Sequence, residues 1–78
     1  MRDVVLYGRA ECHLCDEARA LLRSLDGVRL REVDIDGDDA LLAAYLERIP
    51  VVEVDGRIVS ELVPDVDAIR DAVHTVGP

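Results

Sequence analysis

The sequence predicts an α/β fold built on a four-stranded mixed sheet that helices cover on both faces. Strand-like and helix-like apolar patterns follow one another in the order βαβ, α, β-hairpin, α. Asp55-Gly56 separates two short apolar runs, as is typical of a tight hairpin turn. A right-handed βαβ crossover makes the first two strands parallel, and the hairpin adds two antiparallel strands. Because no linker or repeat divides the chain, we expect residues 1–78 to form a single domain.

The first strand and helix are predicted over about residues 4 to 25. Val4 to Tyr7 is a continuous apolar run, which suits a central strand buried on both faces. From about Cys12 to Leu25 apolar residues recur at helical spacing, and Gly27 follows where a helix end favours glycine. The residues of this apolar face are Leu14, Ala18, Leu21, Leu22 and Leu25.

The middle of the chain predicts a second strand and a second helix. Val28 to Ile35 suits a strand, but its apolar positions change phase between Leu30 and Val33, which predicts a bulge or a short paired region there. The stretch Asp36-Gly37-Asp38-Asp39 can start a helix that runs to about Glu47. Its apolar face comes from Leu41, Leu42, Tyr45 and Leu46.

The last third predicts a hairpin and a helix. The hairpin covers residues 49–59, and Pro64 can occupy the first turn of the final helix. The apolar face of that helix consists of Val66, Ile69, Val73 and Val76.

The only cysteines, Cys12 and Cys15, lie where the first strand is expected to end and the first helix to begin. Their i, i+3 spacing brings both thiols to one helix face, close enough for a disulfide. At a helix N-terminus, the free N–H groups of Leu14 and Cys15 and the helix dipole favour the thiolate of Cys12. Cys15 would then resolve a mixed disulfide held on Cys12. The pair therefore predicts a two-thiol redox centre.

Two other interpretations of the cysteine pair stay open. With His13 and His74 the pair would offer four zinc ligands, but His74 stands alone near the C-terminus, whereas structural zinc ligands usually come as two compact pairs. We therefore predict no metal site within one chain, while zinc shared between two chains remains an alternative. The cysteines could also be merely small core residues.

Composition and charge exclude several partner classes. The formal net charge is −8, the nine basic residues are all Arg, and Tyr7 and Tyr45 are the only aromatic residues. Nucleic acid and anionic membrane surfaces would be repelled, and the stacking platforms that bind single strands are absent. The N-terminal apolar run is too short for a secretory signal, and no stretch is long enough to span a membrane. We expect a cytoplasmic monomer that binds neither nucleic acid nor membrane.

The order of these features resembles a known family. Cys-x-x-Cys at a helix start, followed about 35 residues later by Ile49-Pro50 and a hairpin turning at Asp-Gly, is similar to glutaredoxins, the smallest form of the thioredoxin fold. The run Cys-His-Leu-Cys-Asp-Glu-Ala most resembles a group of small glutaredoxin-like proteins. The resemblance covers nearly the whole chain. It implies a thioredoxin-like fold of the glutaredoxin type and a thiol-disulfide oxidoreductase with Cys12 attacking and Cys15 resolving.

The resemblance also implies a substrate-binding set around the thiols. Pro50 would be a cis-proline facing the cysteines, and the backbone of Ile49 would pair with an extended substrate. Arg9 matches a basic residue that could hold a substrate carboxylate. His13 and Leu14 stand where glutaredoxins typically have Pro and Tyr, and His13 could tune the charge at Cys12.

Departures from the glutaredoxin pattern bear on the cosubstrate. Leu14 removes the ring that flanks bound glutathione, and Val59-Ser60-Glu61-Leu62 replaces the Gly-Gly-x-Asp segment that holds its glutamyl end. Acidic residues around the cysteines oppose both an anionic thiol and the thiolate of Cys12. We therefore predict no resident cofactor and poor use of glutathione, leaving another low-molecular-weight thiol or a protein reductase as electron donor.

Two functional hypotheses follow. In the first, the protein is an oxidoreductase whose Cys12/Cys15 pair reacts with a disulfide-containing protein or a small thiol substrate. In the second, it is a non-catalytic thioredoxin-fold module whose paired thiols bind a metal or a partner protein.

Overall fold

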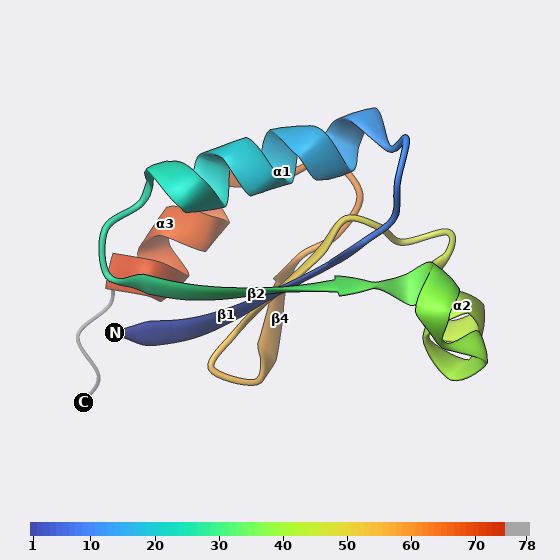
Figure 1. Cartoon of the computed structure of the whole chain (residues 1–78). Coiled ribbons are helices and arrows are strands. Elements are labelled where there is room, and N and C mark those ends of the chain that lie inside the picture. The colour runs from blue at the N-terminus through green and yellow to red at the C-terminus, as the bar shows by residue number, and fades with distance from the viewer. Residues whose placement is uncertain (75–78) are drawn as a thin grey trace.

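A computed structural model of the protein describes residues 1–74, and its element order confirms the predicted one (Figure 1). The elements are β1 (Arg2–Gly8), α1 (His13–Ser24), β2 (Val28–Asp34), the 3₁₀ turn η1 (Ile35–Gly37), α2 (Asp39–Tyr45), β3 (Val51–Val54), β4 (Arg57–Ser60) and α3 (Val66–His74). The described helices are all too short or too polar to cross a membrane.

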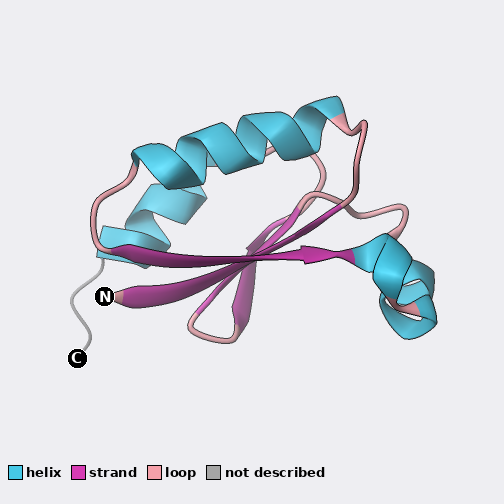
Figure 2. Ribbon diagram, viewed as in Figure 1, coloured by secondary structure: helices cyan, strands magenta, loops and turns pink. Residues whose placement is uncertain are grey.

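The four strands form the predicted mixed sheet in the order β2-β1-β3-β4 (Figure 2). β1 pairs in parallel with β2 and antiparallel with β3, and β3 pairs antiparallel with β4. β1 is therefore central, as its continuous apolar run indicated. Because β1 ends at Gly8 and β3 begins with Val51 opposite Tyr7, the segments before α1 and before β3 meet at one end of the sheet.

α1 and α3 lie side by side on one face of the sheet and enclose the hydrophobic core (Figure 1). The core is aliphatic, as the near absence of aromatic residues requires. Its buried members are Val4, Leu6, Ala18, Leu22, Val52, Val54, Ile69 and Val73.

The other face of the sheet is covered only at one end, by α2. The Tyr45 ring at the end of α2 stacks on the Tyr7 ring from β1, with 4.8 Å between the ring centroids. A hydrogen bond to Glu53, helped by burial, raises the pKa of Tyr7 to about 12. Helices thus lie on both faces of the sheet, as predicted, but they cover the two faces unequally.

The predicted irregularity in β2 is wrong. All seven residues of β2 pair with β1 without a register shift. The apolar phase breaks because Glu32, an exposed residue, lies within reach of α1, where its carboxylate accepts hydrogen bonds from Arg19 and Arg23. Glu32 therefore stands where an apolar residue was expected without disturbing the strand, because the guanidinium groups of Arg19 and Arg23 neutralise its charge.

The irregularity lies in the hairpin instead. The β3–β4 register shifts between Val52 and Glu53, so that Glu53 pairs with Ile58 while Val59 packs against the core. The turn itself is as predicted: Asp55 and Gly56 have φ values of 50° and 85°, the positive pair that a two-residue type I′ turn requires.

The boundaries of two helices differ from the expected ones. α2 ends at Tyr45 rather than near Glu47, because the Tyr45 carbonyl accepts from the N–H groups of both Arg48 and Ile49 in a closing turn. Pro64 lies before α3 rather than in its first turn, and the Asp65 side chain caps the helix by accepting from the Ala68 N–H at 3.0 Å. The predicted apolar position Val76 lies outside the described residues.

Candidate redox site

Cys12 and Cys15 lie at disulfide-bonding distance at the start of α1. Their Cα atoms are 5.1 Å apart, within the range that a disulfide spans without movement of the backbone. The two sulfurs are joined in this structure, and no other cysteine exists in the chain. The predicted dithiol/disulfide chemistry is thus available within one chain.

The start of α1 places the Cys12 sulfur where negative charge is stabilised. Cys12 is the N-cap residue, and its Sγ accepts a hydrogen bond from the Cys15 N–H at 3.2 Å. A helix N-terminus otherwise leaves such N–H groups without partners, and its dipole favours an anion. The arrangement therefore lowers the free energy of a Cys12 thiolate relative to the thiol.

The two cysteines differ in exposure. Cys15 is fully buried, whereas Cys12 is partly exposed. A substrate sulfur can approach Cys12 from solvent but cannot reach Cys15 directly. This asymmetry favours Cys12 as the attacking sulfur and Cys15 as the resolving one.

Two backbone positions shape this site: Gly8, which the sequence analysis did not single out, and Glu11, which it considered only for its negative charge. Gly8 ends β1 against Cys15, where a Cβ on Gly8 would lie 3.1 Å from the Cys15 Sγ. Glu11 has a φ of 59°, a left-handed conformation unusual for a residue with a side chain, and it turns the chain directly before Cys12. A glycine directly after a buried strand is the one sequence signal that could have drawn attention to Gly8.

Ile49 and Pro50 lie at the same end of the sheet as the loop that leads to Cys12. The Ile49-Pro50 peptide is cis, as the family resemblance implied. Pro50 is buried, and the Ile49 N–H donates to the Tyr45 carbonyl at 3.0 Å. Backbone pairing of a substrate with Ile49 stays a prediction, and with the N–H occupied it would use the Ile49 carbonyl.

The other expected binding residues, His13, Leu14 and Arg9, differ in their exposure and in whether they already have a charged partner. His13 is the exposed first residue of α1, and Leu14 is half-buried after it. Arg9 forms an ion pair with Asp36 at 3.2 Å, with both side chains partly exposed. The Arg9 guanidinium therefore already has one carboxylate partner, and a substrate carboxylate would share the guanidinium with Asp36.

The acidic residues near the site differ in whether an arginine pairs with them. Asp16 pairs with Arg19 at 2.7 Å, and Arg19 also binds Glu32 on β2. The hydrogen bond from Arg19 is the main reason that the pKa of Glu32 lies below its usual value. Glu11 and Glu17, by contrast, are exposed and form no ion pair with any residue from 1 to 74.

The loop after β4 is held by internal bonds. The Leu62 N–H donates to the Arg48 carbonyl at 2.9 Å, and the Asp65 N–H donates to the buried Ser60 hydroxyl at 2.9 Å. The Glu61 side chain pairs with the Arg48 guanidinium, whose pKa it raises. The Leu62 and Asp65 N–H groups and the Glu61 carboxylate, which could otherwise bind a ligand at this loop, are thus engaged within the protein.

The structure gathers no group of three or more His, Cys, Asp or Glu side chains that could hold a metal ion, as far as residues 1–74 are concerned. His74 ends α3 with an exposed side chain, where a basic residue complements the helix dipole.

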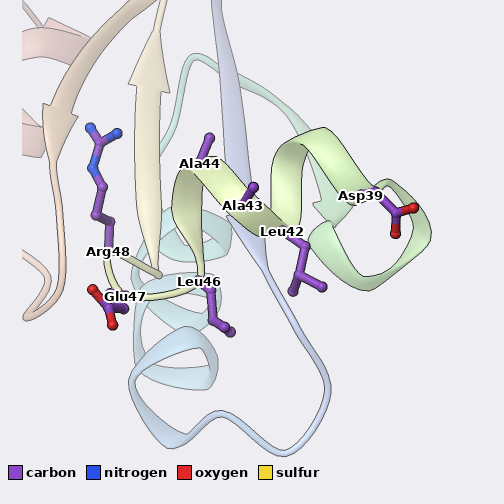
Figure 3. Close-up of a pocket in the computed structure, with 7 residues that line it drawn as sticks. All are labelled: Asp39, Leu42, Ala43, Ala44, Leu46, Glu47 and Arg48. Atoms are coloured by element: carbon purple, nitrogen blue, oxygen red, sulfur yellow. The ribbon is translucent and has the colours of Figure 1, made fainter.

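A hollow of about 680 Å³ lies apart from the cysteine pair, along α2 and the turn that follows it (Figure 3). Its lining contains no cysteine, histidine or hydroxyl nucleophile, so the hollow is separate from the candidate redox site. The residues that line it are Asp39, Leu42, Ala43, Ala44, Leu46, Glu47 and Arg48.

Comparison with known proteins decides the family. The model of the Glutaredoxin-like domain (DUF836) matches residues 3–73. The chain belongs to this glutaredoxin-like family. The family assignment confirms the resemblance drawn from the Cys-x-x-Cys and Ile-Pro elements of the sequence. No curated protein matches the chain.

Solved structures of other proteins have the same fold as this chain. A protein from Nitrosomonas europaea is 34% identical with a TM-score of 0.78, and the match covers 92% of this chain and 91% of that protein. A protein from X. campestris is 38% identical with a TM-score of 0.66, covering 86% and 89%. A mutant thioredoxin from Halobacterium salinarum, at 21% identity, has a TM-score of 0.63 over 99% of this chain and 78% of its own, which shows the shared thioredoxin fold.

Proposed function

We propose that this glutaredoxin-like protein is a thiol-disulfide oxidoreductase that acts on disulfide-containing proteins or small disulfides. One observation carries the proposal: a partly exposed sulfur, that of Cys12, caps a helix N-terminus within disulfide distance of the buried Cys15. This arrangement supplies a stabilised nucleophile together with a protected second thiol that can release the product.

The proposed reaction has two exchanges. In the first, the Cys12 thiolate attacks one sulfur of the substrate disulfide, forms a mixed disulfide and expels the other sulfur as a thiolate. In the second, the Cys15 thiol loses its proton and attacks the Cys12 sulfur, forming the Cys12–Cys15 disulfide and expelling the second substrate thiolate. Two electrons pass from the protein to the substrate, and both leaving thiolates take up protons.

Return to the dithiol form requires an external thiol reductant. Two backbone donors of the loop after β4, the Leu62 and Asp65 N–H groups, already have acceptors, which argues against glutathione as an efficient donor. The net charge of −8 also opposes an anionic thiol. We propose a protein reductase or another small thiol in this role. No cofactor is part of the proposed cycle.

The proposed activity is tested by catalysed reduction of insulin disulfides with a small dithiol as reductant. The wild-type protein is expected to accelerate insulin reduction above the rate of the dithiol alone, and Cys12→Ser to abolish that acceleration. Cys12→Ser removes one sulfur at a partly exposed position, so circular dichroism should confirm that the variant keeps the fold. Equal rates with and without the wild-type protein would contradict the proposal and favour a non-catalytic binding module.

A further inference from the structure

A small cleft lies between α1 and the segment that leads into α3. Its volume is about 200 Å³, and it is lined by Glu17, Leu21, Val63, Pro64 and Val66. Figure 1 shows the segment before α3 passing alongside the N-terminal half of α1, the end of that helix that carries the cysteine pair. The cleft has the size for one side chain rather than for a cofactor.

The surface around the cleft is unusually apolar for this acidic protein. Val63 is 68% exposed, Leu62 is 50% exposed and Val66 is 40% exposed. These three residues lie within five positions of one another and account for half of the large exposed hydrophobic side chains described, the others being Met1, Leu46 and Ile58. A concentrated apolar patch of this kind is typical of an interaction surface.

The cleft lies within reach of a partner bound at Cys12. Glu17 is five residues after Cys12, the N-cap residue of α1, which corresponds to about 7.5 Å of helix rise and a rotation of about 140° around the helix axis. An extended peptide covers about 3.3 Å per residue, so the second or third residue from a partner cysteine on Cys12 would reach the cleft.

The charge at the edge of the cleft is uncompensated. Glu17 and Glu11 form no ion pair within residues 1–74, whereas their neighbour Asp16 is neutralised by Arg19. Two other acids, Asp36 and Glu61, are paired with arginines as well, whereas the Asp65 side chain, between two lining residues of the cleft, accepts only a backbone hydrogen bond from the Ala68 N–H within residues 1–74. A free carboxylate beside an apolar cleft is complementary to a partner that carries a cation next to an apolar side chain.

We propose that this cleft is the docking site for a protein substrate that places an apolar side chain between Leu21 and Val63 and a Lys or Arg against Glu17. The proposal rests on the proposed oxidoreductase function and specifies its substrate class: disulfides in cationic, apolar protein segments. A small anionic disulfide would gain neither contact.

Matched peptide disulfides test the docking site. Three peptides would carry the same cysteine in a mixed disulfide with a neutral thiol, with Lys and Leu, Asp and Leu, or Lys and Ser at the second and third following positions. Second-order rate constants for reduction by the pre-reduced protein are compared with that for a small neutral disulfide, which corrects for any change in the reactivity of Cys12. The Lys/Leu peptide is expected to react about two- to fivefold faster than the Asp/Leu peptide, the range for an exposed ion pair. It should exceed the Lys/Ser peptide by about tenfold.

Two variants assign the effects to the cleft. Glu17→Lys should reverse the preference between the Lys/Leu and Asp/Leu peptides, and Val63→Asp should remove the advantage of Leu over Ser. Glu47→Lys and Leu46→Asp make the same changes at exposed positions on the turn after α2, and both should behave as the wild type does. Because Val63 and Glu17 are exposed, neither substitution removes core packing.

The outcomes separate the docking site from the redox function. Equal rates for the three peptides, with normal reduction of the small disulfide, would overturn the docking site alone. The same conclusion follows if Glu47→Lys alters the preference as much as Glu17→Lys, since net charge would then explain it. Failure of the pre-reduced wild-type protein to reduce even the small disulfide would overturn the redox function and the docking site together.

Discussion

Gly8 and Cys15 lie so close together that a Cβ on Gly8 would be 3.1 Å from the Cys15 Sγ and 3.3 Å from its Cβ. The end of β1 thus lies directly against the Cys15 sulfur, and a side chain at position 8 would require Cys15 to shift by a few tenths of an ångström. The residue at the end of β1 therefore limits where Cys15 can lie relative to Cys12, and the proposed disulfide chemistry depends on that position.

Gly8→Ala is therefore expected to disturb the site, although it adds only one methyl group. The added methyl group displaces Cys15, which should slow formation of the Cys12–Cys15 disulfide and lower the free energy of unfolding by about 1–3 kcal/mol, the usual cost of overpacking. Gly37→Ala is the matched control, because a Cβ there meets nothing within 4 Å. Chemical denaturation and the rate of disulfide formation measure both effects, and equal behaviour of the two variants would show that the close approach is unimportant.

Replacing one cysteine at a time should show which sulfur attacks the substrate and which resolves the mixed disulfide. Because Cys12 is partly exposed and Cys15 is fully buried, Cys15→Ser should accumulate a mixed disulfide on Cys12 when it meets a disulfide substrate. Cys12→Ser should accumulate almost none. Non-reducing electrophoresis and mass spectrometry measure the trapped species, and comparable trapping by both variants would contradict the assigned roles.

The ion-pair cluster of Glu32 with Arg19 and Arg23 predicts a pH-dependent contribution to stability. The Arg19 hydrogen bond holds the pKa of Glu32 below its ordinary value of 4.5, so the folded state binds that proton less tightly than the unfolded state does. The stabilisation is complete above the unfolded pKa and disappears as the pH falls through the folded one. About a third of the Glu32 side chain is exposed, so solvent screening limits the contribution to about 0.5–1 kcal/mol.

Glu32→Gln should accordingly be less stable than the wild type at neutral pH, and the difference should vanish in acid. Urea denaturation at a series of pH values gives the free energy of unfolding for both proteins. Glu47→Gln serves as the control, because Glu47 is exposed and forms no ion pair within residues 1–74. A difference between Glu32→Gln and the wild type that stays constant with pH would contradict an electrostatic origin.

Glutathione is expected to be a poor electron donor. The Leu62 and Asp65 N–H groups of the loop after β4 are occupied, and the overall charge of −8 repels an anionic thiol. Reduction of a small mixed disulfide, followed with glutathione or with thioredoxin as donor, should be faster with thioredoxin. Turnover with glutathione in the ordinary enzyme range, a kcat of about 1–10³ s⁻¹, would show that the loop does not limit glutathione binding.

Local signals in the sequence predicted most of the fold and the position of the redox pair. The Cys-x-x-Cys spacing at a helix start and the Asp55-Gly56 turn each depend on neighbouring residues, and both have the predicted backbone geometry. The regular β2 could not be predicted, because it depends on Arg19 and Arg23 reaching Glu32 from a different element. Contacts between elements far apart in the sequence leave no periodic pattern.

The same reason explains what was missed at the site. The role of Gly8 depends on the approach of Cys15 from the following helix, and the pairing of Arg9 with Asp36 joins the loop after β1 to the 3₁₀ turn η1. The sequence located the two sulfurs, but only the assembled fold shows that one is buried and the other partly exposed.

The central claim is that Cys12 and Cys15 form a reversible disulfide within one chain, and intact mass measurement tests it most directly. The protein is reduced, then treated with a mild oxidant, and each sample is alkylated under denaturing conditions. The oxidised sample should have lost two hydrogens, resist alkylation and keep the mass of a single chain, and a thiol reductant should restore two alkylated cysteines. Two alkylated cysteines in the oxidised sample, or a disulfide-linked dimer in place of the single chain, would contradict the claim.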